Sequence, residues 1–376
     1  MSKVKCSASR VRRRWLFSVV AVCCVMSTGV SASASGDVVR ADDGMQVLPR
    51  GGAVRYRAVP LPELASAPRG TYGIDLTDDS ELLAAISWSG SIHDLRAGYL
   101  VGAQTGTKVL ASPPSWNTGV RVAAMNERKK VVGVASQEYK PYSAAVRWET
   151  PTSPAVDIGL YPSGVSVKAL NAAGDTLVTN RSFSYEIVIN TTVIDGPNAR
   201  KLTPADPSWQ QLEGTDLADD GTAVGLVVNY DYFNHRSFVH LFIAPGNSAV
   251  AQELELPSSA YAVATAQVQT TPDGARIVGQ IDDQMVVWDA MLRGKNVGKV
   301  PGFVLKDVAP SGAVLAMSQQ VPVLIRNQRI HPIEVWGVPA GAKLIDVTRI
   351  NRTTQISGTI ALPDGRERAV LLTPIR

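Results

Sequence analysis

Cysteine is scarce in this sequence. The 376 residues contain three cysteines, Cys6, Cys23 and Cys24, all within the first 24 positions. The remainder of the chain therefore lacks the thiols required for a disulfide framework or a cysteine-ligated metal centre.

Acidic residues are missing from positions 1–34, where six basic residues precede the apolar run Trp15–Met26. The small residues Ala32-Ser33-Ala34 follow that run and form a cleavage-type motif. This order predicts a secretory signal peptide over 1–34, and an apolar run of this length is too short for a membrane anchor. We therefore expect an exported protein, secreted or periplasmic, without stable membrane insertion.

The charge balance changes once this segment is set aside. Six of the 37 basic residues and none of the 33 acidic residues lie before residue 35, which leaves 31 basic and 33 acidic residues. A nucleic-acid partner is not expected, because no basic excess remains to meet phosphates.

Motifs for catalysis and cofactors are also missing. The sequence has no G-x-S-x-G, H-E-x-x-H or phosphate-loop pattern. Its four histidines, among them His93, His235 and His240, are not spaced as a ligand set, so we predict no metal and no cofactor. A glycosidase or lyase would need two facing carboxylates. The loop acids that could supply them are Glu138, Asp206, Asp231 and Asp282.

Helical periodicity is absent over any stretch of ten or more residues. Residues 35–53 are polar and aperiodic, which predicts a disordered leader. From Arg55 onward, short runs rich in Val, Ile, Thr and aromatic residues alternate with Gly, Pro, Asn and Asp, which predicts strands and turns.

A strand–turn–strand unit is what the sequence does contain, most clearly in VRVAAMNERKKVVGVAS at 120–136. Copies recur at intervals of 38 to 53 residues, with a mean near 46. Their turns are anchored on Ser80, Lys129, Gly174, Gly221, Gly274, Gly312 and Thr354. Two further strand-like runs follow most copies. The pattern predicts an all-β fold, a seven-bladed β-propeller of four-stranded antiparallel blades over residues 54–376. The seventh copy lacks a fourth strand, and the spare run Arg55–Leu61 is expected to close that blade.

The repeat resembles the extracellular HAF-type repeat, with the consensus A-x-x-I-N-x-x-G-x-V-V-G-x-S followed by A-F-L-W and D-L-G strands. The best match is AAMNERKKVVGVAS, AAVRWE and AVDIG within Ala123–Gly159, and the name-giving tripeptide is absent. The resemblance spans Arg55 to about Pro374. It implies a secreted propeller-like array and supplies no catalytic residues.

In a propeller, the connections from strand four to strand one share a face with the loops from strand two to strand three. We call this the top face. Every predicted entry connection carries an aromatic residue: Tyr72, Trp116, Tyr161, Trp209, Tyr261, Phe303 and Trp336. Such a ring could stack on planar ligands such as sugars. Residues that seal one blade against the next would also be placed regularly, and we favour that interpretation.

The predicted loops between strands two and three are uneven, long and aromatic in the first four units and short at Asp282–Gln284 and Gln319-Gln320. The run NYDYFNHRSF at 229–238 is the most site-like. The predicted ligand-binding residues are Trp88, His93, Trp116, Tyr139, Tyr142, Trp209, Tyr230, Asp231, Tyr232, His235 and Arg236.

These features predict a non-enzymatic scaffold, expected to be a monomer, that binds a small molecule, glycan or protein on the top face. Two alternatives remain open. One is an extracellular carbohydrate-active hydrolase or lyase that uses the loop carboxylates, and the other is a purely structural module.

Overall fold

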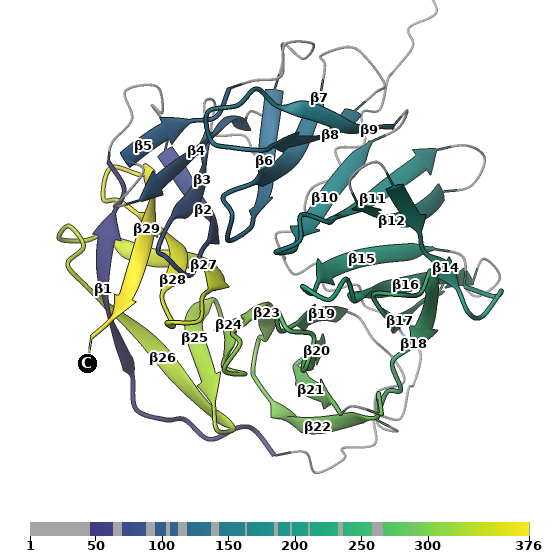
Figure 1. The fold of residues 1–376 in the computed structure, drawn as a ribbon. Coiled ribbons are helices and arrows are strands. Elements are labelled where there is room, and N and C mark those ends of the chain that lie inside the picture. Colours follow the sequence, from purple (N-terminus) through teal and green to yellow (C-terminus); the bar gives the residue numbers. More distant parts are fainter. Residues whose placement is uncertain are drawn as a thin grey trace, which may run out of the picture. The chain divides into compact units, whose positions relative to one another are not determined.

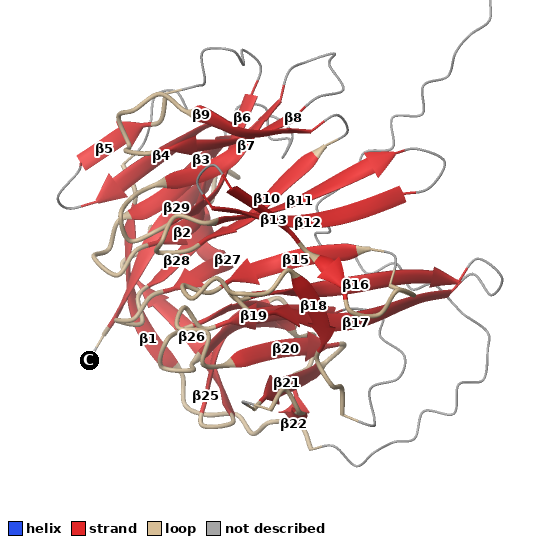
Figure 2. Ribbon diagram, turned by 45° about the vertical axis from the view of Figure 1, so that its right-hand side comes forward, coloured by secondary structure: helices blue, strands red, loops and turns tan. Residues whose placement is uncertain are grey.

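The computed structural model describes residues 46–62, 70–87, 95–102, 106–111, 119–136, 143–161, 164–183, 187–195, 198–209, 211–231, 236–257, 266–289 and 291–375. Regular structure in these residues is entirely β (Figures 1 and 2), as the sequence predicts. Within them, no helix has the length and apolar character needed to cross a membrane.

The strands pair in antiparallel groups that follow chain order. The first two groups are β2 (Gly70–Leu76), β3 (Leu82–Ser87), β4 (Leu95–Gly102) and β5 (Gly106–Val109), then β6 (Gly119–Met125), β7 (Val131–Ser136), β8 (Ser143–Trp148) and β9 (Val156–Tyr161). The next two are β10 (Val165–Leu170), β11 (Thr176–Phe183), β12 (Ile187–Asp195) and β13 (Asn198–Lys201), then β15 (Leu212–Leu217), β16 (Ala223–Asp231), β17 (Arg236–Ala244) and β18 (Val250–Glu253). Two more follow, β19 (Ala266–Thr270), β20 (Ile277–Ile281), β21 (Gln284–Trp288) and β22 (Gly294–Lys299), then β23 (Val304–Val308), β24 (Val314–Ser318), β25 (Val321–Arg326) and β26 (Arg329–Trp336). The last group comprises β27 (Lys343–Ile350), β28 (Ile356–Ala361) and β29 (Glu367–Pro374). The short strand β14 (Thr203–Pro204) pairs in parallel with the outer strand β18.

The N-terminal strand β1 (Val54–Pro60) joins the two ends of the chain. It pairs antiparallel with β29, from Tyr56 opposite Pro374 to Pro60 opposite Val370. This is the pairing expected of the spare run at Arg55–Leu61. On its other edge β1 pairs in parallel with β26, with Val54 opposite Ile333. Through β1, the last group is therefore hydrogen-bonded to the group before it.

Residues 46–53, the end of the predicted disordered leader, are ordered. Leu48 N donates to the Lys299 carbonyl at 2.9 Å, and Gly51 N donates to the Ile330 carbonyl at 2.8 Å. Leu48 is buried in the core between β20–β21 and β23–β26. The leader prediction is therefore wrong for this segment, because the segment pairs with the outer strands β22 and β26.

The predicted turn anchors are the points at which the backbone turns back on itself. All of the anchors, Ser80, Lys129, Gly174, Gly221, Gly274, Gly312 and Thr354, have φ between 61° and 106°. Each donates its N–H to the carbonyl three residues earlier, as Lys129 does to Asn126 at 2.8 Å. A type I turn followed by a left-handed residue is a common hairpin connection. The recurring polar turn in the sequence therefore marks a real and repeated geometry.

The first strands of successive groups touch one another. β2 contacts β6, β6 contacts β10, and the series continues through β15, β19, β23 and β27. β27 in turn contacts β2, so the series closes on itself. Apolar side chains fill the space between neighbouring sheets; the buried strand β7, for example, packs towards both sides. Strands buried on both faces are expected to read as continuous apolar runs, as VVGVA does.

Candidate functional site

Most of the predicted ligand-binding residues lie outside the described part of the chain. These are Trp88, His93, Trp116, Tyr139, Tyr142, Tyr232 and His235. The acid Glu138 lies outside it as well. Their role remains a prediction from the sequence.

The predicted hairpin at 229–238 is placed in part. β16 and β17 pair along nine positions, ending with Tyr230 opposite Ser237 and Asp231 opposite Arg236. Its neighbour in sequence, the β11–β12 hairpin, pairs along eight positions. In contrast, β20–β21 and β24–β25 each pair along five. The strands of these two successive hairpins are therefore longer than those of the two later ones (Figure 2). The long loops predicted for the first four units lie largely outside the described residues.

Three of the predicted entry aromatics lie in different environments. Trp209 is 6% exposed and Phe303 is 2% exposed, and each packs in the core between two sheets. Trp336 is 56% exposed and lies beneath the Arg55 guanidinium, 5.9 Å from its ring centroid. For Trp209 and Phe303 the packing interpretation holds. Trp209, predicted to bind a ligand, therefore does not present an open ring.

Trp209 does contact a polar cluster on the outer part of its sheet. Its ring stacks on His240 at a centroid distance of 6.2 Å and an interplanar angle of 25°. His240 Nδ1 lies 2.7 Å from Glu253 Oε1, and both side chains are partly exposed. The His240–Glu253 pair joins β17 to β18. Asp206 precedes this cluster, and the Ser208 N–H holds the pKa of its carboxyl below the usual range.

Of the predicted loop acids, Asp206 and Asp282 have side chains that the structure describes. Asp206 is exposed and its pKa is lowered, which suits a turn residue better than a general acid. Asp282 has φ 50° in the short β20–β21 turn. Among the described residues, no cluster of three His, Cys, Asp or Glu side chains is arranged to hold a metal ion.

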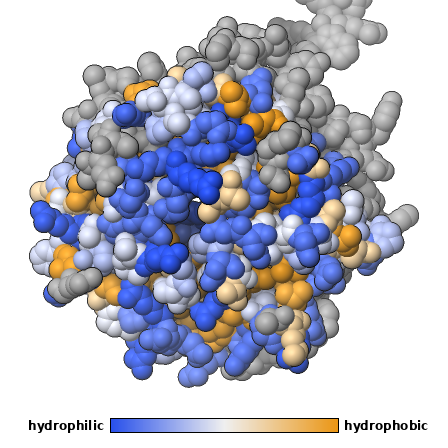
Figure 3. Space-filling view, in the orientation of Figure 1, coloured by the Kyte–Doolittle hydropathy of each residue, from blue (hydrophilic) through white to orange (hydrophobic). Residues whose placement is uncertain are grey.

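The centre of the molecule is polar. An opening at the middle of one face is surrounded by hydrophilic surface (Figure 3). Along β10, β15 and β23, fully buried side chains alternate with half-buried ones. Because neighbouring sheets flank each first strand, solvent reaches these half-buried side chains from the centre or from the two ends. Lys168 pairs there with Glu213 at 2.9 Å, and Lys306 pairs with Asp346 at 2.8 Å.

Arg349 forms the main ionic cluster at this centre. Its Nε donates to Asp75 Oδ1 at 3.0 Å, and its Nη1 donates to Asp307 Oδ1 at 3.0 Å. The two carboxylates are 4% and 6% exposed, whereas the Arg349 side chain is 29% exposed. Arg349 thereby ties β27 to β2 on one side and to β23 on the other. Charge-assisted bonds of this kind are stronger than neutral ones.

Three buried aspartates also bond to the backbone of the next first strand. Asp75 Oδ2 accepts from Met125 N at 2.8 Å, Asp216 Oδ2 accepts from Thr270 N at 3.0 Å, and Asp307 Oδ2 accepts from Ile350 N at 2.7 Å. Each aspartate satisfies a backbone donor that would otherwise be buried without a partner. The aspartates therefore connect neighbouring sheets near the centre.

The electrostatics of the cluster follow from burial and pairing. The carboxylates of Asp307 and Asp75 raise the pKa of Arg349 well above its ordinary value. Burial raises the pKa of Asp216, which has no ion-pair partner among the described residues. Burial also raises the pKa of Asp307, although Arg349 opposes that shift. Removal of Arg349 would therefore leave buried negative charge uncompensated.

Sequence reasoning missed this cluster, although a signal was present. Asp75, Asp216, Asp307 and Arg349 each stand five residues before the turn anchor of their unit. A charged residue at a fixed distance from a repeated turn indicates one shared position in the fold. In the sequence, these aspartates cannot be told apart from other scattered acidic residues, because only some of the units carry one at this position.

Asparagines at the turns also connect neighbouring sheets through hydrogen bonds to backbone carbonyls. Asn126 Nδ2 donates to the Asn171 carbonyl at 3.0 Å, and Asn171 Nδ2 donates to the Ala218 carbonyl at 3.2 Å. Asn351 Nδ2 donates to the Thr77 carbonyl at 2.9 Å. Each bond links a turn to the corresponding turn of the next sheet. The polar groups at the centre thus act mainly to hold the sheets together.

Comparison with known proteins bears on the fold alone. No family model matches the sequence, and no curated protein matches it. The structure is similar to the β-propeller domain of the Trilobed protease from Pyrococcus furiosus, with a TM-score of 0.55 and 9% identity over 81% of this chain and 97% of that one. That domain has an open velcro topology, whereas β1 here pairs with β29.

Two further structures show the same likeness. One is the acylaminoacyl peptidase of Pyrococcus horikoshii, with a TM-score of 0.51 and 11% identity over 81% of this chain. This chain spans only 53% of that peptidase. The other is a chain of the Mitotic Checkpoint Complex, with a TM-score of 0.50 and 11% identity over 87% of this chain and 96% of that one. At such low identity the likeness establishes the architecture and no activity. The chain has the β-propeller fold.

Proposed function

We propose that this protein is an exported seven-bladed β-propeller that binds a partner molecule on its top face without chemistry of its own. The blade count is supported by the closed series of contacts among the first strands. It is also supported by the pairing of β1 with β29, which supplies the last group with a fourth strand. Export is supported by the signal-like segment at 1–34.

One observation carries the assignment of the binding face. The β11–β12 and β16–β17 hairpins belong to successive groups, and both extend further than β20–β21 and β24–β25. A binding site needs this kind of asymmetry, because structural repeats are otherwise alike. The second hairpin carries Tyr230, Asp231 and Arg236 at the close of its ladder.

Absence of chemistry is supported by the described acids. Asp206 is exposed with a lowered pKa, and the buried aspartates are bonded to backbone donors. None of these aspartates combines a raised pKa with an open position, which is the combination that general acid catalysis needs. Glu127 is exposed and burial of its carboxyl raises its pKa, but both of its oxygens accept from the Asp78 N–H.

The test is a binding screen of glycans and metabolites on the mature protein, with turnover followed in the same samples. Once a ligand is found, Tyr230→Ala and Tyr232→Ala should weaken binding at least tenfold if each aromatic contact contributes about 1.4 kcal/mol. Glu138→Gln should leave binding nearly unchanged.

The matched control is Met291→Ala, which removes a 74% exposed apolar side chain between β21 and β22. It should have no effect on binding. Turnover that is abolished by Asp231→Asn would establish the enzyme alternative instead. A complete lack of binding across the screen would reject the top-face assignment, and an experimental structure with six or eight sheets around the axis would reject the blade count.

A further inference from the structure

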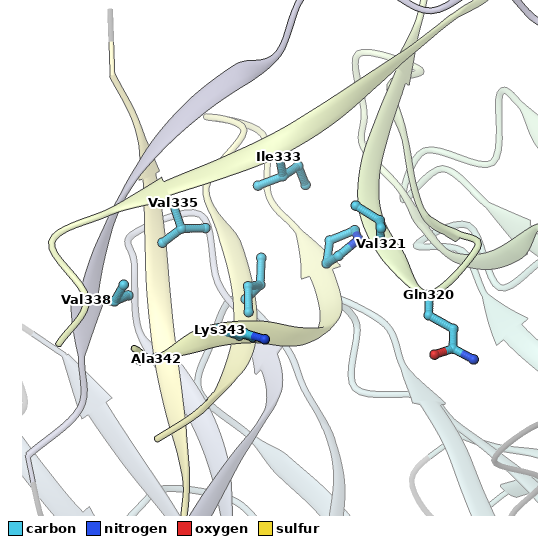
Figure 4. A pocket seen from close by; sticks show the side chains of 9 residues that line it. Gln320, Val321, Ile333, Val335, Val338, Ala342 and Lys343 are labelled. Carbon is cyan, nitrogen blue, oxygen red and sulfur yellow. The ribbon is translucent and has the colours of Figure 1, made fainter. Parts of the chain in front are cut away.

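An apolar slot opens between β25–β26 and β27 (Figure 4). Its volume is about 290 Å³. It is lined by Gln320, Val321, Pro322, Ile333, Val335, Val338, Ala342, Lys343 and Leu344. All of these residues lie within the continuously described stretch 291–375.

The slot is the open end of an inter-sheet core. Ile333 is a buried member of that core, and Val335, Val338 and Leu344 pack against its edge. Deeper in the same core, Leu315, Leu324 and Val347 are fully buried. The apolar lining is therefore continuous with the interior of the protein and is shaped by well-packed strands.

The connections on either side of the slot are short and do not cover it. The β24–β25 turn consists of Gln319 and Gln320, both with positive φ, at 49° and 65°. Such a two-residue turn reverses the chain tightly and reaches little beyond the strands. Residues 337–342 then connect β26 to β27 on the other side. Both connections belong to the top face, at a distance along the chain from the long hairpins.

The mouth of the slot is polar and positive. Lys343 is exposed, and it makes no ion pair with any described residue. Gln320 adds an amide at the opposite rim (Figure 4). No carboxylate lines the slot. Apolar walls with one cation at the entrance are complementary to a molecule with an apolar body and an anionic end.

We infer that this slot binds a small carboxylate with an apolar body of up to about eight carbons. A volume of about 290 Å³ lies at the lower end of the usual range for ligand pockets, which suits a small body of this kind. The body lies against Ile333, Val335 and Leu344, and the carboxylate faces Lys343. The inference is independent of the partner proposed for the long hairpins.

The probes are butanoate, hexanoate, octanoate and dodecanoate, titrated into the full chain by calorimetry and followed by saturation-transfer NMR. Affinity should rise by up to about fourfold per added methylene while the slot fills. It should stop rising beyond about eight carbons. For a ligand of this size, octanoate should bind with a dissociation constant of about 1 mM or tighter.

Two variants separate the slot from unspecific association. Lys343→Met should leave octanol binding unchanged and remove the preference for octanoate over octylammonium. Lys295→Met, at an exposed position of strand β22, is the matched control and should keep that preference. Ala342→Phe should abolish binding by filling the slot, with its folding checked by thermal unfolding.

Three outcomes would overturn the inference. The first is absence of octanoate binding at concentrations of about 10 mM, ten times the expected constant. The second is an affinity that keeps rising through dodecanoate, which would indicate an open apolar surface. The third is a charge preference that survives Lys343→Met. If Ala342→Phe fails to fold, the Lys343→Met comparison decides alone.

Discussion

Replacing Arg349 with methionine should test whether the central ion cluster holds the ring of sheets together. The change keeps much of the side-chain volume and removes the charge between Asp75 and Asp307, which are 4% and 6% exposed. Removing one partner of a buried ion pair costs about 3–5 kcal/mol, because the remaining charge stays desolvated. Arg349 itself is 29% exposed, which places the expected loss near the lower end, at about 3 kcal/mol.

That loss can be converted into a melting temperature. At about 2.1 cal/mol/K per residue, the unfolding entropy of the unit 42–376 is roughly 0.7 kcal/mol/K. A loss of about 3 kcal/mol should therefore lower Tm by roughly 4 °C in calorimetry at neutral pH. Urea unfolding at constant m should give the same free-energy difference.

The effect should also depend on pH. Without Arg349, only the backbone hydrogen bonds to Asp307 oppose the rise in its pKa that burial causes. A carboxyl with a raised folded pKa binds its proton more tightly in the folded state than in the unfolded chain. The stability lost in Arg349→Met should therefore be greatest at pH values above the pKa of Asp307 in the folded variant. The loss should shrink as the pH falls through that pKa.

Arg352→Met supplies the control. Arg352 pairs with Asp78 at 3.1 Å and likewise joins the β27–β28 unit to the first sheet, but its side chain is 73% exposed. An exposed pair contributes at most about 1 kcal/mol, so the shift in Tm should stay below roughly 1.5 °C. Equal effects for the two variants, or an Arg349→Met deficit that does not change between pH 4 and pH 8, would refute the reasoning.

Three other substitutions follow from local geometry. Gln328→Gly should stabilise the protein by about 0.5–1 kcal/mol in urea unfolding, because Gln328 is exposed with φ 57° after Asn327 in a tight turn, and Gln328→Ala should give no such gain. Gly246→Ala should destabilise by about 1–3 kcal/mol, because a Cβ there would clash with the Asp220 carbonyl oxygen. Gly52→Ala is the control and should be neutral, because a Cβ there meets nothing within 4 Å. Asp216→Asn should be more stable than the natural protein at pH 7, because burial disfavours the charged carboxylate and raises the pKa of Asp216. The difference should shrink as the pH falls, because protonation of Asp216 then stabilises the natural protein. A difference that stays constant with pH would contradict the raised pKa.

The turn positions were the most predictable part of this protein. A left-handed residue after a type I turn leaves a short polar signature, and all the anchors taken from the sequence have positive φ. The spare run at Arg55–Leu61 was equally informative, because a sheet with a missing strand requires one from elsewhere. These features are local or follow from counting, so the sequence alone carries them.

Features set by contacts between distant segments were less predictable. Residues 46–53 look disordered by composition, and yet Leu48 enters a core formed by strands more than 200 residues away. Trp209 has the chemistry of a stacking residue, but its ring is covered by the neighbouring sheet. The aspartates around Arg349 gain their meaning only once the first strands are placed side by side. Long-range placement decides each of these cases, and a single sequence does not encode it in a local pattern.

The pairing of β1 with β29 has a consequence for the time course of folding. Tyr56 meets Pro374, so a strand made near the start of synthesis must wait about 300 residues for its antiparallel partner. At roughly 5–20 residues per second, that wait lasts about 15–60 s. During this interval β1 has an unpaired edge, and the sheets formed in the meantime cannot close into a ring. Loss of the eight-residue strand β29 should therefore leave β1 paired only with β26, with the edge that β29 covers left open.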